Sequence, residues 1–133
     1  MLDTNTVSYI VKASSPTARA HLTSLSTDEV ACISCITAAE LWYGLAKVGA
    51  SRRRLNSLRD FLERLQVLPW GREEAVAYGT FRAKQEAVGK PLGPFDTQIA
   101  AHAIAVGAVL VSHDAAFQRA AGLPGLEVWA TDL

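Results

Sequence analysis

The chain has no apolar run long enough to cross a membrane, no low-complexity segment and no internal repeat. Its longest mainly apolar stretch, residues 99–111, is interrupted by His102 and Gly107 and falls short of the ~20 residues that a membrane helix needs. The first residues lack the basic and apolar segments of a signal peptide. We therefore expect a soluble, cytoplasmic protein that folds as one domain, residues 1–133.

Cysteine is scarce, and the only two, Cys32 and Cys35, have a spacing that redox pairs and zinc sites also use. Residues 30–33 have the character of a strand, and extended residues three positions apart lie roughly 10 Å from each other, beyond disulfide reach. No second such pair is present to complete a zinc site. We expect ordinary buried thiols.

Neither sign of charge is in excess, because 13 Lys and Arg balance 13 Asp and Glu. A net charge of zero argues neither for nor against a nucleic-acid partner. Four acids gathered around a metal ion would leave about nine acidic groups against the 13 basic ones, and that balance attracts phosphates.

Strand and helix patterns alternate along the chain. Strands are predicted near residues 2–3, 30–33, 67–68, 109–111 and 126–129, with helices near 4–12, 16–25, 37–47, 52–65 and 73–88, from 96 onward, and near 115–122. Ser15-Pro16, Ser51, Thr37 with Glu40, and Asp114 supply the helix-start signals. Because crossovers between parallel strands place helices on both faces, we predict a three-layer α/β/α fold with a parallel sheet.

Four acids are predicted to meet at one edge of this sheet. Asp3 and Asp114 directly follow strands, Glu40 lies in the helix after the second strand, and Asp96 begins the helix that leads into the fourth. Such a cluster needs a compensating cation, and hard oxygen ligands favour Mg²⁺ or Mn²⁺. The chemistry that this combination indicates is phosphodiester hydrolysis.

The segments that carry these acids resemble, in order, the motifs of the PIN-domain family. They are Leu2-Asp3-Thr4-Asn5, Ser34-Cys35-Ile36-Thr37-Ala38-Ala39-Glu40-Leu41, Gly93-Pro94-Phe95-Asp96-Thr97-Gln98-Ile99-Ala100-Ala101-His102-Ala103 and Leu110-Val111-Ser112-His113-Asp114. In detail, and over nearly the whole chain, they are similar to the VapC toxins of bacterial toxin–antitoxin pairs. The resemblance implies a five-stranded parallel sheet flanked by helices and a ribonuclease that uses Mg²⁺ or Mn²⁺.

The resemblance also assigns roles to individual residues. Asp3, Glu40, Asp96 and Asp114 match the catalytic, metal-binding acids of the family, while Asn5 and Ser112 match positions that orient these carboxylates. It further implies a homodimer, a tRNA or rRNA substrate, and a cognate antitoxin whose C-terminal segment enters the active-site groove. Relatives usually have a few more residues before the first acid, so the first strand is expected either to be short or to begin upstream of Met1.

Taken singly, three of the acids have structural explanations. Glu40 would complete a capping box with Thr37, Asp96 would interact with the dipole of its helix, and Asp114 would serve as an N-cap. None of these explanations accounts for the order of all four motifs, so we favour the catalytic interpretation.

For other polar and aromatic residues, the sequence allows both a functional and a structural interpretation. The RNA contacts we consider are Arg52 and Arg53, in a basic stretch that also suits a solvated helix face, and Arg82 and Lys84. For His21, His102 and His113 we favour packing or surface roles, because a metal-dependent mechanism needs no histidine. Trp42, Tyr43 and Trp70 suit a core or a dimer interface better than base stacking.

Two rival functions follow from the same residues. Asp3-Thr4-Asn5-Thr6 superficially resembles the D-x-D-x-T loop of haloacid-dehalogenase phosphatases, but Asn5 stands where the second Asp belongs. A PIN fold can also act as a non-catalytic binding module, although such a module would be expected to have lost some of the acids. The metal-dependent ribonuclease is therefore the preferred hypothesis.

Overall fold

The computed structural model describes residues 1–133, and its strands are short. They are β1 (Cys32–Ser34), β2 (Gln66–Leu68), β3 (Leu110–Val111) and β4 (Leu126–Glu127). β1 pairs in parallel with β2, and β3 in parallel with β4. The predicted parallel pairing is present in two two-stranded sheets, whose ladders span only two or three residues. A single five-stranded sheet stays a prediction.

Residues 1–3 lie between β1 and β3 and connect the two sheets. The Leu2 N–H donates to the Cys32 carbonyl at 2.9 Å, and the Asp3 N–H donates to the Val111 carbonyl at 3.0 Å. Leu2 also forms an isolated parallel bridge with Val111. The expected first strand is therefore reduced to a bridge, and Asp3 follows it directly.

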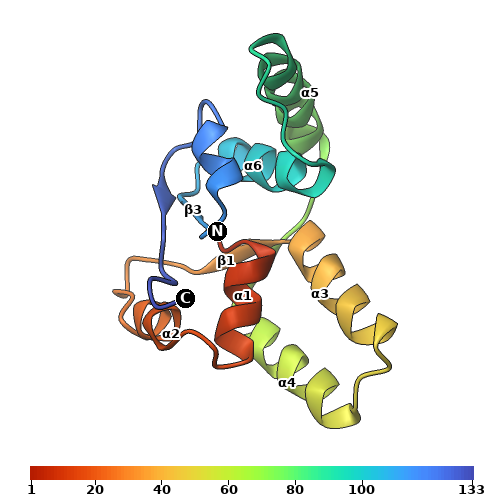
Figure 1. Ribbon diagram of the computed structural model, residues 1–133, viewed down its shortest axis with the longest axis vertical. Helices are drawn as coiled ribbons and strands as arrows, with labels where there is room; N and C mark the ends of the chain where they lie inside the picture. Colours follow the sequence, from red (N-terminus) through yellow and green to blue (C-terminus); the bar gives the residue numbers. More distant parts are fainter.

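Six α-helices and one 3₁₀ helix account for most of the chain (Figure 1). They are α1 (Thr4–Val11), α2 (Pro16–Thr23), α3 (Cys35–Lys47), α4 (Arg52–Glu63), α5 (Arg72–Ala87), α6 (Pro94–Val106) and the 3₁₀ helix η1 (Ala115–Arg119). The predicted caps of α2 and α4 are confirmed, since the side chains of Ser15 and Ser51 accept N–H groups of the first turn. None of the helices is long and apolar enough to span a bilayer.

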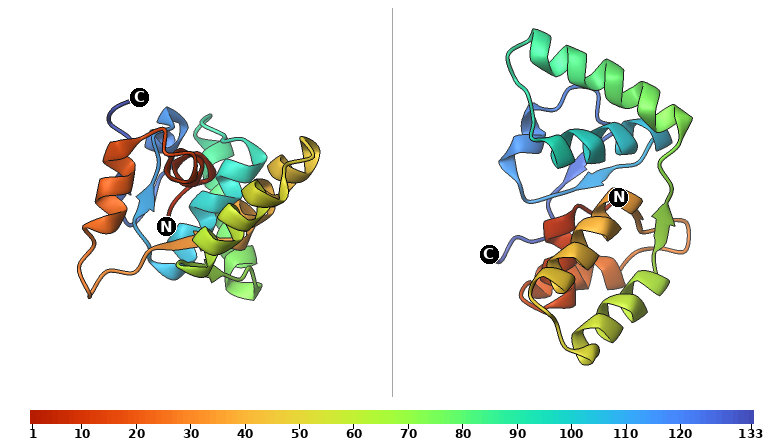
Figure 2. Two further views of the ribbon diagram at one scale, coloured as in Figure 1. Left: turned by 90° about the horizontal axis from the view of Figure 1, so that it is seen from below. Right: turned by 90° about the vertical axis from the view of Figure 1, so that its right-hand side faces the viewer.

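The extended segments present successive side chains to two different cores. Leu2 and Val111 belong to a first core, formed with α1, α2 and α4, whereas Met1 and Leu110 belong to a second core, formed with α5, α6 and η1. Because neighbouring residues of a strand point to opposite faces, helices cover both faces of the extended layer. The right-hand view in Figure 2 shows the blue strands between the α5–α6 helices above and the α1–α4 helices below.

The start of α3 corrects one prediction. Its N-cap is Ser34, whose hydroxyl accepts the Ile36 N–H at 3.1 Å, so the helix begins at Cys35 and not near Thr37. Thr37 is instead a buried helix residue whose hydroxyl has no hydrogen-bond partner. The capping-box explanation of Glu40 is therefore wrong, because a cap at the end of β1 leaves no turn for Thr37 to cap.

Smaller differences concern α6, η1 and the cysteines. α6 begins at Pro94, so Asp96 is its third residue, and the helix after Asp114 is a 3₁₀ helix that ends at Arg119. Cys32 and Cys35 are both free thiols. Cys32 is buried, as expected, whereas Cys35 is only half-buried, because it opens α3 and does not extend the strand.

Candidate active site

Asp3 ends the connecting segment and caps α1. It is 4% exposed, and both of its carboxylate oxygens accept hydrogen bonds. The Thr6 N–H donates to Oδ1 at 2.8 Å, and the Ser112 hydroxyl donates to Oδ2 at 2.5 Å. The position of this carboxylate is therefore set by donors of the protein itself.

Ser112 connects Asp3 to Asp114. Its buried hydroxyl, which donates to Asp3, also accepts the Asp114 N–H at 3.0 Å. The side chain of Asp114 is exposed and caps η1, with Oδ1 accepting the Ala116 N–H at 2.9 Å. This geometry matches the supporting role predicted for Ser112, whose effect on catalysis stays a prediction.

Glu40 reaches the site from the second turn of α3. It is half-buried, and the Thr4 hydroxyl donates to its Oε1 at 2.8 Å. The sequence did not predict this contact between Thr4 and Glu40.

Asp96 is the acid whose pKa is affected by the charges of the other three. The side chain is half-buried in the first turn of α6 and makes no hydrogen bond to the protein. Its pKa is raised, first by burial and then by the negative charges of Asp114, Asp3 and Glu40. Asp96 therefore lies close enough to all three acids to feel their charge.

The donor set suits a hard divalent cation, although its side chains are not arranged as ready-made ligands. No three His, Cys, Asp or Glu side chains converge closely enough to enclose an ion as they stand. The repulsion that raises the pKa of Asp96 is nevertheless what a cation among these carboxylates would relieve. Carboxylate oxygens are the ligands that Mg²⁺ and Mn²⁺ prefer.

The other residue predicted to support the acids, Asn5, takes no part in this network. Its side chain is exposed and makes no hydrogen bond within the chain. The predicted role of Asn5 in orienting the carboxylates stays a prediction.

A groove of about 680 Å³, here called the basic groove, extends from the site between α1, α3 and α4. Glu40 lines it together with Arg53, a predicted RNA contact, with Arg54 of the same basic stretch, and with Lys12, which the sequence did not single out. Arg52, also predicted, is exposed on α4 but does not line the groove. One of the two predicted arginines of α4 is thus in the same cavity as an acid.

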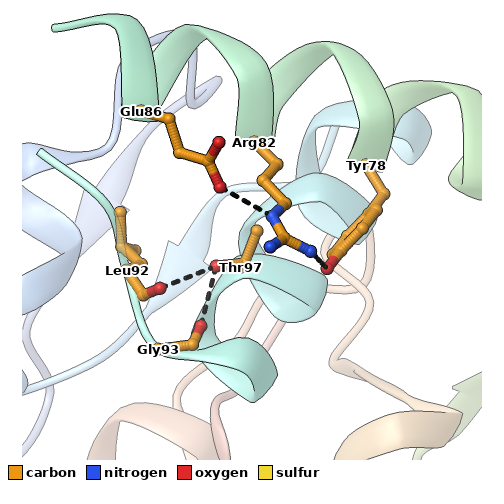
Figure 3. A network of polar contacts seen from close by, with 6 residues as sticks. All are labelled: Tyr78, Arg82, Glu86, Leu92, Gly93 and Thr97. Carbon is orange, nitrogen blue, oxygen red and sulfur yellow. Dashed lines mark hydrogen bonds and ion pairs between the residues drawn. The ribbon is translucent and has the colours of Figure 1, made fainter. Parts of the chain in front are cut away.

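The two basic candidates on α5 are placed differently. Arg82 donates to Glu86 at 2.8 Å and to the Tyr78 hydroxyl at 3.1 Å (Figure 3), and these hydrogen bonds raise its pKa. Lys84 is exposed, and it lines none of the larger pockets. Arg82 is therefore held by its own helix, and RNA contacts by both residues stay predictions.

His102 is a buried packing residue, as expected. Its Nδ1 lies 2.7 Å from the Ser34 hydroxyl, and its ring meets that of Trp70 edge-on. Burial lowers the pKa of His102 despite the opposing charge of Glu74, so the neutral ring joins α6 to the N-cap of α3.

The remaining histidines and aromatic residues lie in packing or surface positions. His21 stacks on Trp129, and His113 is exposed. Trp42 packs against the first core, whereas Tyr43 is 65% exposed. Packing or surface positions are thus confirmed for the histidines, and Tyr43 is available to a partner.

Comparison with known proteins agrees with the order of the motifs. The PIN domain family model matches residues 1–123. The tRNA(fMet)-specific endonuclease VapC of Salmonella typhimurium is 38% identical over 129 residues, which cover 96% of this chain and 94% of the relative. The ribonuclease VapC2 of Haemophilus influenzae is 38% identical over 118 residues, which cover 86% of this chain and 85% of the relative.

Solved structures show the same fold. VapBC2 from Rickettsia felis, bound to a DNA fragment from their promoter, matches with a TM-score of 0.90 and 33% identity, over 97% of each chain. DNA-bound VapBC from Salmonella typhimurium matches with a TM-score of 0.88 and 38% identity, over 97% of this chain and 96% of that one. With four acids coupled at the end of a parallel layer and these similarities over its whole length, the chain belongs to the PIN-domain family.

Proposed function

We propose that this chain is a metal-dependent endoribonuclease of the VapC kind, which hydrolyses phosphodiester bonds in RNA. The observation that supports it is the electrostatic coupling of Asp96 to Asp3, Glu40 and Asp114, four carboxylates from distant parts of the sequence. Relatives with 38% identity are named as a tRNA(fMet)-specific endonuclease and a ribonuclease. The same likeness argues against the phosphatase alternative, as does the burial of Asp3, whose two oxygens are both hydrogen-bonded.

In this proposal Asp3, Glu40, Asp96 and Asp114 hold Mg²⁺ or Mn²⁺. When bound, such a cation polarises a phosphate oxygen and stabilises the negative charge that develops on the reacting phosphate. Ser112 keeps Asp3 in place relative to the Asp114 backbone, and Thr4 does the same for Glu40. Hydrogen bonds within the protein thereby hold the carboxylates of Asp3 and Glu40 and the backbone of Asp114 in place without the cation.

We also propose that a cognate, VapB-like antitoxin silences the enzyme and that the active form is a homodimer. The likeness to VapBC complexes supports the antitoxin. Exposed apolar side chains on or next to α3 and on α5, among them Tyr43, Val48 and Val76, offer surface for a partner to cover. The substrate is proposed to be tRNA or rRNA, which places the enzyme in the cytoplasm.

The whole chain, residues 1–133, is proposed to act as one PIN domain with a single five-stranded sheet. The hydrogen bonds of residues 1–3 to both β1 and β3 support this, because they bridge the two small sheets in parallel. The alternation of side chains between two cores supports it as well.

Cleavage of RNA by the purified protein, freed of antitoxin, tests the function. We expect cleavage with Mg²⁺ or Mn²⁺, none with a chelator, and none by Asp96→Asn with an unchanged circular dichroism spectrum. Asp28→Asn, in an exposed loop, is the matched control and should cleave normally. Equal cleavage by Asp96→Asn would reveal a contaminating nuclease, and no cleavage by the wild type would favour a non-catalytic module.

The substrate is found by mapping new RNA 5′ ends after brief expression of the wild type and of Asp96→Asn. Ends that appear only with the wild type identify the RNA and the cut position. Ends shared by both proteins would contradict the assignment.

A further inference from the structure

One face of α1 forms a ridge beside the acids. Asn5, Ser8, Tyr9 and Lys12 are spaced at i, i+3, i+4 and i+7, the spacing that places residues on one side of a helix. Asn5, Ser8 and Lys12 line the basic groove on one flank of the ridge. Asn5 and Tyr9 line a second, open pocket of about 370 Å³ on the other flank.

This second pocket, here called the Tyr9 pocket, is completed by His113, Asp114 and Ala115. It shares Asp114 with the acidic site, and it shares Asn5 with the basic groove. The two cavities therefore adjoin at Asn5, two residues after Asp3. A polymer whose backbone crossed the acids would have the groove on one side and the Tyr9 pocket on the other.

The polar groups of Tyr9 and Asn5 in this pocket are free to bind a ligand. Tyr9 is half-buried and packs against the first core, so its ring is held in place while one part faces the pocket. Its hydroxyl makes no hydrogen bond within the chain, and neither does the exposed amide of Asn5. A fixed aromatic ring beside an unused amide, with two donors and one acceptor, suits a flat ligand with polar edges.

The charges differ between the two flanks. The basic groove contains Lys12, Arg53 and Arg54, whereas the Tyr9 pocket has no lysine or arginine. Phosphates are attracted to the first and not to the second. The Tyr9 pocket thus has an aromatic surface and polar groups without phosphate-binding charge, which is the chemistry that receives an unpaired base.

We infer that the Tyr9 pocket binds the base of a nucleotide next to the scissile phosphate, with Tyr9 as the stacking surface and Asn5 as the reader of the base edge. The inference rests on the proposed ribonuclease function and deepens it, because it names the residues that select the cleavage site. Sequence-specific recognition of single-stranded RNA commonly combines stacking on an aromatic ring with hydrogen bonds to the base edge.

The test uses a short RNA spanning the mapped cut, with 2-aminopurine placed just before or just after the scissile phosphate. Binding is measured with Asp96→Asn protein in a chelator, so that the RNA is not cut. Stacking should quench the fluorescence of one of the two probes. We expect Tyr9→Leu, which keeps an apolar side chain against the core, to remove the quenching and weaken binding about tenfold, whereas Tyr9→Phe keeps both.

Asn5→Ala, in the otherwise wild-type enzyme, separates base reading from support of the carboxylates. If Asn5 reads the base, the variant should lose preference among RNAs that differ at the probed nucleotide while still cutting its best substrate. An equal loss of kcat on every RNA would instead show that Asn5 orients the acids and would overturn its assignment. Val30→Ala, at an exposed apolar residue in the loop before β1, is the control and should change none of these readouts.

The result that overturns the inference is distinct from failure of the function. RNA cleavage that depends on Asp96, together with quenching unaltered in Tyr9→Leu, would leave the ribonuclease intact and assign the Tyr9 pocket to another ligand, such as a segment of the antitoxin. Absence of cleavage by the wild type would instead contradict the proposed function itself.

Discussion

The strand side and the helix side of the site hold their acids in different ways. Asp3 and Asp114, which follow extended segments, accept hydrogen bonds from Thr6, Ser112 and Ala116. On the helix side, Glu40 accepts one hydrogen bond, from Thr4, and Asp96 accepts none. The pKa of Asp96 is raised by burial and by the other three acids.

The difference assigns the two sides different physical tasks. Carboxylates with protein donors keep their positions in the absence of a cation, because the donors compensate part of their charge. Because the pKa of Asp96 is raised, its ionised form costs folding free energy in the absence of a cation. The carboxylates of Asp3 and Asp114 are therefore held in position by hydrogen bonds, and Asp96 is the acid whose repulsion a bound cation would relieve.

The largest expected effect is a difference in the free energy of unfolding between the variants Asp3→Ala and Asp96→Asn. Asp3→Ala and Asp96→Asn should both reduce cleavage to background. Asp3→Ala should also lower the free energy of unfolding by about 2–3 kcal/mol, because it removes the cap of α1 and the partner of Ser112. Asp96→Asn should lower it not at all or raise it. Urea unfolding in a chelator measures this, and equal destabilisation by both variants would remove the distinction.

The pH dependence of the metal-free protein sharpens the same distinction. Because the pKa of Asp96 is raised in the folded state, its stabilising contribution is complete below the unfolded value of about 4 and is lost as the pH rises through the folded value. The stability of Asp96→Asn relative to the wild type should therefore increase as the pH rises from about 4. A difference that stays constant with pH would mean that Asp96 is not under this repulsion.

Ser112→Ala should have an intermediate effect, since it removes the link within the strand side. Without the hydroxyl, one oxygen of Asp3 loses its donor and the Asp114 N–H loses its acceptor. We expect kcat/KM to fall about 10- to 100-fold, the range found when a residue supporting metal ligands is removed. Ser14→Ala, at an exposed serine, is the control. Activity equal to that of the control would show that the positions of Asp3 and Asp114 do not depend on this hydroxyl.

The smallest effect is expected on the helix side, from Thr4→Val. The change removes one partly buried hydrogen bond to Glu40 and leaves the carboxylate able to turn toward a cation. One such bond contributes about 1 kcal/mol, which corresponds to a loss of about fivefold in kcat/KM. Thr23→Val, at the end of α2, is the matched control. A loss larger than that of Ser112→Ala would reverse the assignment of the two sides.

Much of the local structure was predictable because its signals are local. Ser15-Pro16 and Ser51 start helices where the sequence indicates, since an N-cap acts on the next three residues alone. The start of α3 was mispredicted because two nearby residues, Ser34 and Thr37, can both act as an N-cap. Thr37 and Glu40 have the spacing of a capping box, but β1 ends at Ser34, and Ser34 is the nearer acceptor.

The contacts between distant residues were less predictable. Ordered motifs pointed to four acids, yet nothing in the sequence distinguishes Asp3, with two donors, from Asp96, with none. The basic residues show the same limit. Arg53 and Arg54 line the groove with Glu40 and Arg52 does not, although all three are exposed and consecutive in the sequence.

The sequence by itself determined the order of helices and short strands, the caps of α2 and α4, and which acids belong to the family's motifs, because periodicity, capping and motif order act over a few residues at a time. The tertiary structure alone decided which acids have donors, that Ser112 joins two of them, and that Asn5 lies between two cavities of different charge. Those features depend on distances between residues as far apart in sequence as Asp3 and Ser112, and packing of the whole chain sets such distances.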